Sequence, residues 1–219
     1  DSCLVGSEMC IRDSIKTLPI YENRNNRIAI KELLNKKYIA PTIKLWIAFF
    51  SAFVCLYYLI SWIPKMVSDM GLSIELGIYS GTIFNIGAFL GIITQGYFSL
   101  KLGLQRVISA FMILTCILMT QIQYFIDSDL MLFIFGLLGF TIQGGFVGLY
   151  AFAARIYPLE FRTTGIGWGI GLGRFGAVIS PLIGGYLIGA GISISHSFMI
   201  FGAIAFLSGF TVYVTSIKN

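Results

Sequence analysis

Arg174 is the residue whose type and position most clearly suggest chemistry. It is the only charged residue in the 55 residues between Arg162 and Lys218. A guanidinium stays protonated and presents a rigid fork of N–H donors that pairs with both oxygens of a carboxylate. A small organic carboxylate is therefore the natural partner of Arg174. The alternative is a structural clamp on backbone carbonyls or on an acid from elsewhere in the fold.

The composition places this arginine in a membrane protein. Hydrophobic residues make up 57% of the 219 residues and charged residues 11%, against about 45–50% and about 25% in soluble domains. The mean hydropathy is +0.85. There are too few polar side chains to cover a soluble surface and too many Leu, Ile and Phe for disorder. The composition excludes soluble enzymes and predicts an integral membrane protein.

The runs without charge give the number of membrane spans. Four such runs are 20 to 25 residues long, and the longer fifth run is divided by the polar stretch 193–197. One crossing takes about 20 residues, and these runs lack the alternation of a barrel. We therefore predict an all-α membrane protein with six transmembrane helices. The four shorter runs are 45–64, 76–100, 107–126 and 130–154.

The basic residues indicate the orientation. Twelve of the 15 Lys and Arg residues fall on the side that holds the N-terminal linker, and Lys65 lies alone on the other. Since Lys and Arg stay in the cytoplasm, both termini of this chain are predicted to be cytoplasmic. The net charge of +5 then reflects topology, and no nucleic-acid partner is predicted.

The first 44 residues are expected to lie outside the bilayer. Residues 1–14 resemble a translated library adaptor and are interpreted as non-native. Residues 15–44 are interpreted as a basic linker that ends in an amphipathic helix on the membrane, with apolar residues at helical spacing. Residues 45–219 would form a six-helix transporter half, because many transporters consist of two such halves. The spaced apolar residues are Ile30, Leu33, Leu34 and Tyr38.

The fifth span carries small residues on one stripe, which predicts close helix packing. An additional hypothesis is that such smooth faces let helices slide and bend, as alternating access requires. Pro181 predicts a kink. The stripe includes Gly165, Gly169, Gly173 and Gly176.

No cofactor or metal site is predicted. The stretch 171–176 matches G-x-G-x-x-G, but it lacks the preceding strand and the following acid of a dinucleotide site. The cysteines and the lone His196 do not have metal-ligand spacing.

Arg174 is predicted to lie deep in the membrane. It follows Arg162 by 12 residues, which is about 18 Å along a helix, and the hydrocarbon core is about 30 Å thick. A central arginine costs roughly 2.5–3.5 kcal/mol and faces a cavity or the bundle interior. We expect polar and aromatic side chains of other spans to complete a substrate site with it. The candidates are Tyr57, Asn85, Gln143 and Tyr150.

One region of the sequence resembles a known family. Residues 157–168 read Y-P-x-x-x-R-x-T-G-x-G-W, followed by Gly173-Arg174 and by P-x-x-G-G at 181–185. This pattern resembles the tenth-to-eleventh helix region of major facilitator transporters, and most of all the aromatic acid:proton symporters, which carry benzoate-like acids. The resemblance covers residues from about 30 to 219. It implies the C-terminal six helices of a twelve-helix fold, in which Arg162 and Arg174 match paired arginines important for transport.

The resemblance also implies a cytoplasmic gate. The family's G-x-x-x-D-[RK]-x-G-[RK] loop corresponds to residues 96–106, where Leu100 stands at the aspartate position. Lys101 and Arg106, together with Arg162, are assigned to this gate. The family's proton-coupling acid lies in the first helix, which agrees with the lack of Asp or Glu inside these spans.

The sequence as a whole predicts proton symport of a small aromatic carboxylate across a bacterial inner membrane, with a missing N-terminal half as partner. Alternatives within transporters are uptake of a sugar or another organic anion, and export. A membrane enzyme would need His, Asp or Glu clustered inside the spans, and the sequence has none. A scaffold without transport activity would need no arginine at this depth.

Overall fold

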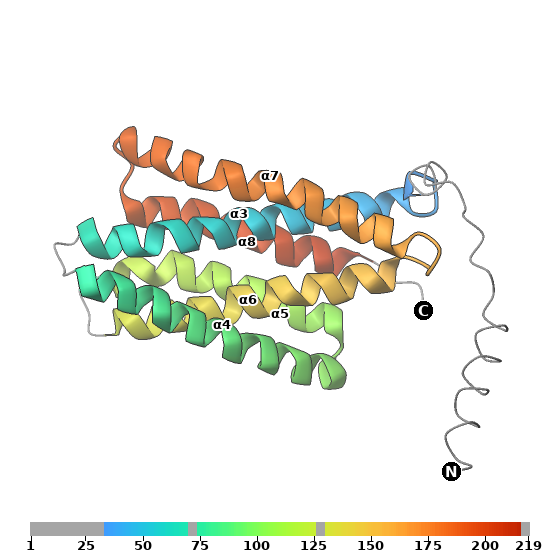
Figure 1. The fold of residues 1–219 in the computed structure, drawn as a ribbon, viewed down its shortest axis with the longest axis horizontal. Coiled ribbons are helices and arrows are strands. Elements are labelled where there is room, and N and C mark those ends of the chain that lie inside the picture. The colour runs from blue at the N-terminus through green and yellow to red at the C-terminus, as the bar shows by residue number, and fades with distance from the viewer. Residues whose placement is uncertain (1–32, 70–73, 126–129, 216–219) are drawn as a thin grey trace, which may run out of the picture.

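The computed structural model describes residues 33–69, 74–125 and 130–215, and these residues form six long helices and one short 3-10 turn (Figure 1). Each long helix is long and apolar enough to cross a membrane. The prediction of an all-α protein with six spans is confirmed. The elements are α3 (Ile39–Asp69), α4 (Ile74–Leu102), α5 (Leu104–Gln121), η1 (Ile122–Tyr124), α6 (Met131–Ile156), α7 (Arg162–Gly189) and α8 (Ile194–Val214).

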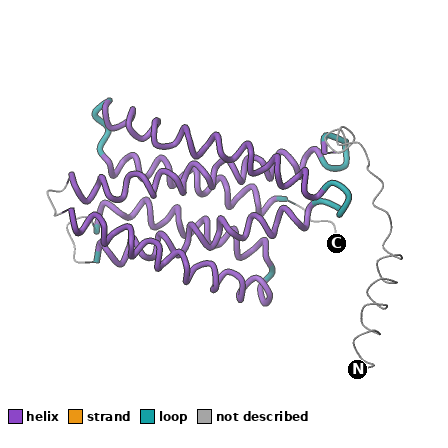
Figure 2. Tube along the Cα trace, in the orientation of Figure 1, coloured by secondary structure: helices purple, strands orange, loops and turns teal. Residues whose placement is uncertain are grey.

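The helices run along a common axis (Figure 2). The start of α3, the α4–α5 turn, the α6–α7 loop and the end of α8 lie at one end of the bundle (Figure 1). Helices α3 and α6 are central, since 61% of each apolar span is buried, against 28% for α4 and 22% for α7. In Figure 1, α7 and α4 accordingly lie at opposite edges.

Helix α3 is longer than the charge-free run that predicted it. It begins at Ile39, before Lys44, and continues through Pro64 and Lys65. A run without charged residues marks only the part of a helix that can lie in the hydrocarbon core. Membrane helices also tolerate proline, because neighbouring groups form hydrogen bonds with the carbonyl that the proline leaves free. Residues 39–44, which the sequence assigns to the linker, form the first turns of α3.

The predicted amphipathic helix of the linker is not continuous with α3. Residues 34–38 form turns, in which the Asn35 carbonyl accepts bonds from the Tyr38 and Ile39 amides at 2.9 Å. Leu33 is buried and Leu34 is exposed. The rest of that helix, including Ile30, and the segment 1–14 lie outside the described residues.

Two connections are tighter than predicted. Residues 96–102 belong to α4, and the loop expected over 96–106 is reduced to Gly103, whose φ of 91° is in the left-handed region that favours glycine. The break between α7 and α8 spans residues 190–193 and not 193–197. Ser193 caps α8 by accepting a hydrogen bond from the His196 amide. His196 therefore lies on the first turn of α8.

Candidate functional site

Five aromatic residues from α3 and α6 contact one another along the facing sides of these helices, and the outermost of them, Tyr57, is exposed. The Phe53 and Phe146 rings are edge-to-face at 4.8 Å, and Phe49 meets Tyr150 in the same way at 5.5 Å. Tyr57 stacks on Phe53 at 6.1 Å. We call Phe49, Phe53, Tyr57, Phe146 and Tyr150 the aromatic cluster.

Helical periodicity builds this cluster. Phe49, Phe53 and Tyr57 are spaced by four residues on α3, and Phe146 and Tyr150 by four on α6, so each set lines one side of its helix. The two helices run in opposite directions, so Phe53 pairs with Phe146 and Phe49 pairs with Tyr150.

Helix α7 makes room for these rings with its glycines. A Cβ on Gly169 would lie 3.0 Å from Phe49 Cδ2, and a Cβ on Gly173 would collide with Phe53 Cδ2. Gly165, Gly169, Gly173 and Gly176 are all buried. The predicted stripe of small residues therefore lies against α3 and its neighbours, where larger side chains would not fit. Pro181 lies within α7, one residue after Ser180, whose hydroxyl donates to the Val54 carbonyl at 2.5 Å.

Arg174 lies next to the aromatic cluster. Its neighbour Gly173 faces Phe53, and the Arg174 side chain is exposed in this chain. The Tyr150 hydroxyl lies within electrostatic range of both the Arg174 guanidinium and the Tyr57 hydroxyl. A helical side chain leans toward the start of its helix, which directs Arg174 toward the level of Tyr150. The structure thus brings together Arg174, Tyr57 and Tyr150, three of the predicted substrate-binding residues.

The space beside Arg174 is open in this chain. A Cβ on Gly167 or Gly171, which share its side of α7, would meet no heavy atom within 4 Å. Among the described residues, carboxylates occur only toward helix ends: Glu75 in the first turn of α4 and Glu160 just before α7, with Asp69 at the end of α3. Within the described part of the chain, no acid is placed to neutralise the guanidinium.

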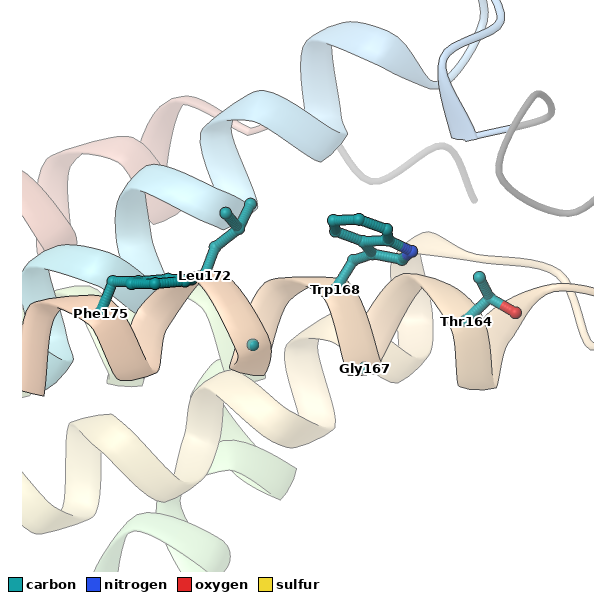
Figure 3. A pocket seen from close by; sticks show the side chains of 6 residues that line it. Thr164, Gly167, Trp168, Leu172 and Phe175 are labelled. Carbon is teal, nitrogen blue, oxygen red and sulfur yellow. The ribbon is translucent and has the colours of Figure 1, made fainter.

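A shallow apolar groove of about 410 Å³ follows the outer side of α7 (Figure 3). Figure 3 shows the side chains of Trp168, Leu172 and Phe175 standing along this part of the helix. Trp168 also packs on Trp46 of α3, with ring centroids 6.4 Å apart. The residues that line the groove include no charged side chain. The neighbouring Arg174 is therefore the group that could bind an anion.

The remaining two predicted substrate-binding residues differ in position. Gln143 is on α6, one turn from Phe146, and its Oε1 is buried without a hydrogen-bond partner in the described structure. Asn85 is exposed on α4, and its Nδ2 donates to the Gly81 carbonyl of its own helix at 2.8 Å. It lines a small cavity of about 50 Å³ with Leu59 and Phe84 among others. Asn85 is not brought to the aromatic cluster.

The predicted gate residues occupy two corners at one end of the bundle. Arg162 begins α7, and its Nε donates to the Tyr157 carbonyl at 3.2 Å. Burial raises the pKa of the Tyr157 phenol, which donates to Thr42 Oγ1 at 3.1 Å. This corner is therefore fixed to the start of α3.

Lys101 and Arg106 lie on either side of Gly103, at the other corner. The Lys101 ammonium lies 4.4 Å from the Tyr97 ring centroid, and Arg106 is exposed. Gln105 between them was not singled out from the sequence. Its Nε2 donates to the carbonyls of Val212, Tyr213 and Thr215 at 2.6–2.8 Å, and so caps the end of α8.

Phe49, Phe53 and Phe146 were also not singled out. Phe53 lies four residues from Tyr57, Phe146 four residues from Tyr150 and Phe49 four residues from Phe53. This spacing is the signal that could have identified them. Among the described residues, no group of three or more His, Cys, Asp or Glu could hold a metal ion.

Comparison with known proteins identifies the family. The sequence model described as Major Facilitator Superfamily matches residues 81–218, more than half of the chain. The chain belongs to the Major Facilitator Superfamily. Its six apolar helices correspond to one half of the fold of this superfamily.

Similar curated members of this superfamily are named as transporters of aromatic acids. The chain is 31% identical over 183 residues to a gallate transporter of Pseudomonas putida, covering 83% of this chain and 41% of that protein. It is 33% identical over 159 residues to the 4-hydroxybenzoate transporter PcaK of Pseudomonas aeruginosa, covering 70% and 35%. A benzoate transport protein of Acinetobacter baylyi is 25% identical over 193 residues, with 88% and 41% covered. The chain therefore spans less than half the length of these relatives, and the resemblance to aromatic acid transporters is confirmed.

Proposed function

We propose that this chain is the C-terminal half of a symporter that moves a small aromatic carboxylate with protons across a bacterial inner membrane. Both termini of the chain would lie in the cytoplasm. The observation that carries the proposal is the position of Arg174, an arginine beside an aromatic cluster and open space, without an acid near it among the described residues. The names of the gallate, 4-hydroxybenzoate and benzoate relatives support the substrate class.

Each part of such a substrate has a complementary group. The guanidinium of Arg174 would bind both carboxylate oxygens, and this charge-assisted pair is strong in a site of low dielectric constant. The substrate ring would pack against the rings of Phe53 and Phe146, whose edge-to-face geometry suits a further aromatic group. Tyr57 and Tyr150 would add phenolic hydroxyls beside the carboxylate.

Proton coupling would need an acid from the other half of the transporter. The six spans hold no Asp or Glu in their interiors, and Arg174 stays protonated. Arg162, Lys101 and Arg106 would act at the cytoplasmic gate, where they lie at two corners of the same bundle end. The glycines of α7 would then let this helix move along α3 during alternating access.

The proposal is tested by uptake into proteoliposomes that contain the complete transporter. We expect uptake of labelled benzoate to rise when the pH gradient drives protons in the same direction as the substrate. In Arg174→Ala, uptake should fall at least about 10-fold, because the loss of a charged hydrogen-bond pair exceeds about 1.4 kcal/mol. Arg174→Lys should retain part of the activity, since it keeps the charge and loses the fork.

Arg155→Ala is the matched control, because Arg155 is exposed in the last turn of α6. Its uptake should stay close to that of the unaltered protein. Full uptake by Arg174→Ala would contradict the binding role, and uptake that ignores the pH gradient would contradict symport. Competition by sugars or non-aromatic acids, but not by benzoate, would favour a transporter of another metabolite, and outward transport would favour an exporter.

A further inference from the structure

The carbonyl groups at the end of α8 are bound by side chains from two other helices. Gln105 lies in the first turn of α5, and its Nε2 donates at 2.6–2.8 Å to three of the four carbonyls of residues 212–215. The Lys44 ammonium of α3 donates to the remaining one, that of Val214, at 3.1 Å. Since the last four carbonyls of a helix lack the usual helical partners, these two side chains supply hydrogen bonds to the whole end of α8.

The sign of the charge matters in this contact. A helix end carries partial negative charge, and carbonyl oxygens only accept hydrogen bonds. The Gln105 amide nitrogen meets them with two N–H donors, one fewer than the oxygens that it contacts. A lysine ammonium has three donors and a positive charge, whereas a glutamate carboxylate has only acceptors and a negative charge. The contact therefore favours a donor at position 105 and disfavours an acid, a preference that side-chain packing alone would not produce.

The contact lies beside one corner of the proposed gate. Gly103 alone separates α4 from α5, and its φ of 91° lets the chain turn within one residue. Lys101 on one side of this turn and Arg106 on the other are the gate residues of this corner. Because so short a connection leaves little freedom, fixing Gln105 in the first turn of α5 also fixes the positions of Lys101 and Arg106.

The end of α8 is also linked to the other corner of the gate. Lys44, which contacts the Val214 carbonyl, lies on α3 two residues after Thr42. Thr42 Oγ1 accepts the hydrogen bond of the Tyr157 phenol, and the Tyr157 carbonyl accepts one from Arg162 Nε. Both corners of the gate therefore connect to the end of α8, one through Gln105 and the other through the first turns of α3.

We propose that Gln105 is a positioning residue of the cytoplasmic gate, which holds Lys101 and Arg106 in place by capping the end of α8. The inference rests on the proposed function, in which these two residues act at the gate. Arg174, which would bind the carboxylate, lies 12 residues into α7 from this end, or about 18 Å along the helix. Substitutions at position 105 should therefore change the rate of the conformational steps, which often limit turnover, and leave substrate affinity unaltered.

The test uses a series of substitutions at position 105 in the complete transporter. Proteoliposomes give the maximal rate of benzoate uptake, and isothermal titration of the purified protein gives the Kd for benzoate. Gln105→Lys should keep the maximal rate within about twofold, because the ammonium supplies a donor to each oxygen. Gln105→Leu should lower the rate about 5-fold through the lost hydrogen bonds, and Gln105→Glu at least about 10-fold, because the carboxylate is also repelled by the helix end. The Kd should be the same in every variant of the series.

Two control variants separate positioning from stability. Gln121→Glu makes the same change at the other end of α5, where the side chain is exposed, and it should keep the full rate. Ser109→Ala removes another hydrogen bond between α5 and α8, from the Ser109 hydroxyl to the Gly209 carbonyl at 2.9 Å. It should also keep the full rate, because Ser109 lies one turn farther from the gate than Gln105. If Gln105→Glu fails to fold, the comparison of Gln105→Lys with Gln105→Leu provides the test.

Three outcomes would contradict the proposal. Equal rates across the series at position 105 would overturn the positioning role while the proposed function stands. A loss in Ser109→Ala as large as that in Gln105→Leu, or a Kd that rises as the rate falls, would do the same. No uptake of benzoate by the unaltered protein would overturn the proposed function and this inference with it.

Discussion

Glycines allow close packing in both the α4–α6 and the α3–α7 contact, but the neighbouring atoms that they approach are of different kinds. On α4, a Cβ added at Gly87 or Gly91 would collide with the backbone carbonyls of Gly136 or Phe140. On α7, a Cβ added at Gly169 or Gly173 would meet the edges of the Phe49 and Phe53 rings. At these positions the first contact is backbone against backbone, and the second is backbone against side chains of the aromatic cluster. Farther along α7, a Cβ on Gly176 would also lie 2.8 Å from the Phe50 carbonyl oxygen.

This difference separates a rigid contact from an adjustable one. Backbone carbonyls in a helix cannot move aside without breaking helical hydrogen bonds, whereas an aromatic ring can turn about its side-chain bonds. The Phe49 and Phe53 rings, which occupy the space beside Gly169 and Gly173 of α7, also belong to the candidate substrate site. Any displacement of α7 along α3 must therefore move Phe49 and Phe53, which couples helix movement to the site.

The largest effect is expected for Gly91→Ala in the α4–α6 contact. The added methyl group has only the Phe140 backbone to meet, so the helices must separate. We expect a loss of about 3 kcal/mol or more of the free energy of unfolding, at the upper end of overpacking effects. Thermal unfolding of the complete transporter in detergent measures this loss.

Gly81→Ala on the same helix is the control, because a Cβ there meets nothing within 4 Å. Its effect should stay within about 0.5 kcal/mol. Similar unfolding temperatures for the two variants would show that α4 and α6 are not packed backbone against backbone.

An intermediate effect is expected for Gly173→Ala in the α3–α7 contact. The methyl group must displace the Phe53 ring, which changes the candidate site more than the fold. We expect the KM for benzoate to rise about 10-fold, equivalent to about 1.4 kcal/mol, while most of the protein remains folded. Uptake kinetics at equal protein levels measure the change.

For comparison, Gly185→Ala on α7 brings a Cβ only to an ordinary 3.7 Å contact with Trp62, and it should change KM little. If Gly173→Ala left KM unaltered, the coupling between the α3–α7 contact and the site would be absent.

The smallest effect is expected for Ser180→Ala. This variant removes the hydrogen bond from the Ser180 hydroxyl to the Val54 carbonyl across α3 and α7. Interhelical hydrogen bonds in membranes contribute about 0.6 kcal/mol on average, so unfolding should shift slightly and KM should not. Ser99→Ala, which removes a bond to the Gly96 carbonyl of its own helix, is the reference. A shift above about 2 kcal/mol would exceed the range for such bonds and would indicate that this contact is as rigid as α4–α6.

The number of membrane helices could be predicted from the sequence because the spacing of charged residues decides it. Charged side chains are excluded from hydrocarbon, so the runs between them mark the spans. The run 45–64 marks only part of α3, because the helix includes Lys44 near its start and Lys65 near its end. Lys44 reaches the Val214 carbonyl at 3.1 Å, a contact between distant parts of the chain that no local pattern reveals.

The candidate site could be predicted only in part. Arg174, Tyr57 and Tyr150 were found from charge, depth and residue type, and they lie together. Phe49, Phe53 and Phe146 were not, because aromatic residues are common throughout an apolar chain, and their spacing of four residues becomes informative only once α3 is known to pack against α6. Asn85 was predicted to join Arg174 on residue type alone. In the structure it lies on α4, where its Nδ2 donates to the Gly81 carbonyl of the same helix.

The central claim is that Arg174 recognises a carboxylate. The most direct test compares the binding affinity of one charged and one uncharged analogue. Isothermal titration of the purified complete transporter compares benzoate with benzamide, which has the same ring and no charge. We predict that the unaltered protein binds benzoate at least about 10-fold more tightly, a difference of about 1.4 kcal/mol, and that Arg174→Ala loses this preference. If Arg174→Ala bound benzoate with unchanged affinity and still discriminated against benzamide, another group would hold the carboxylate.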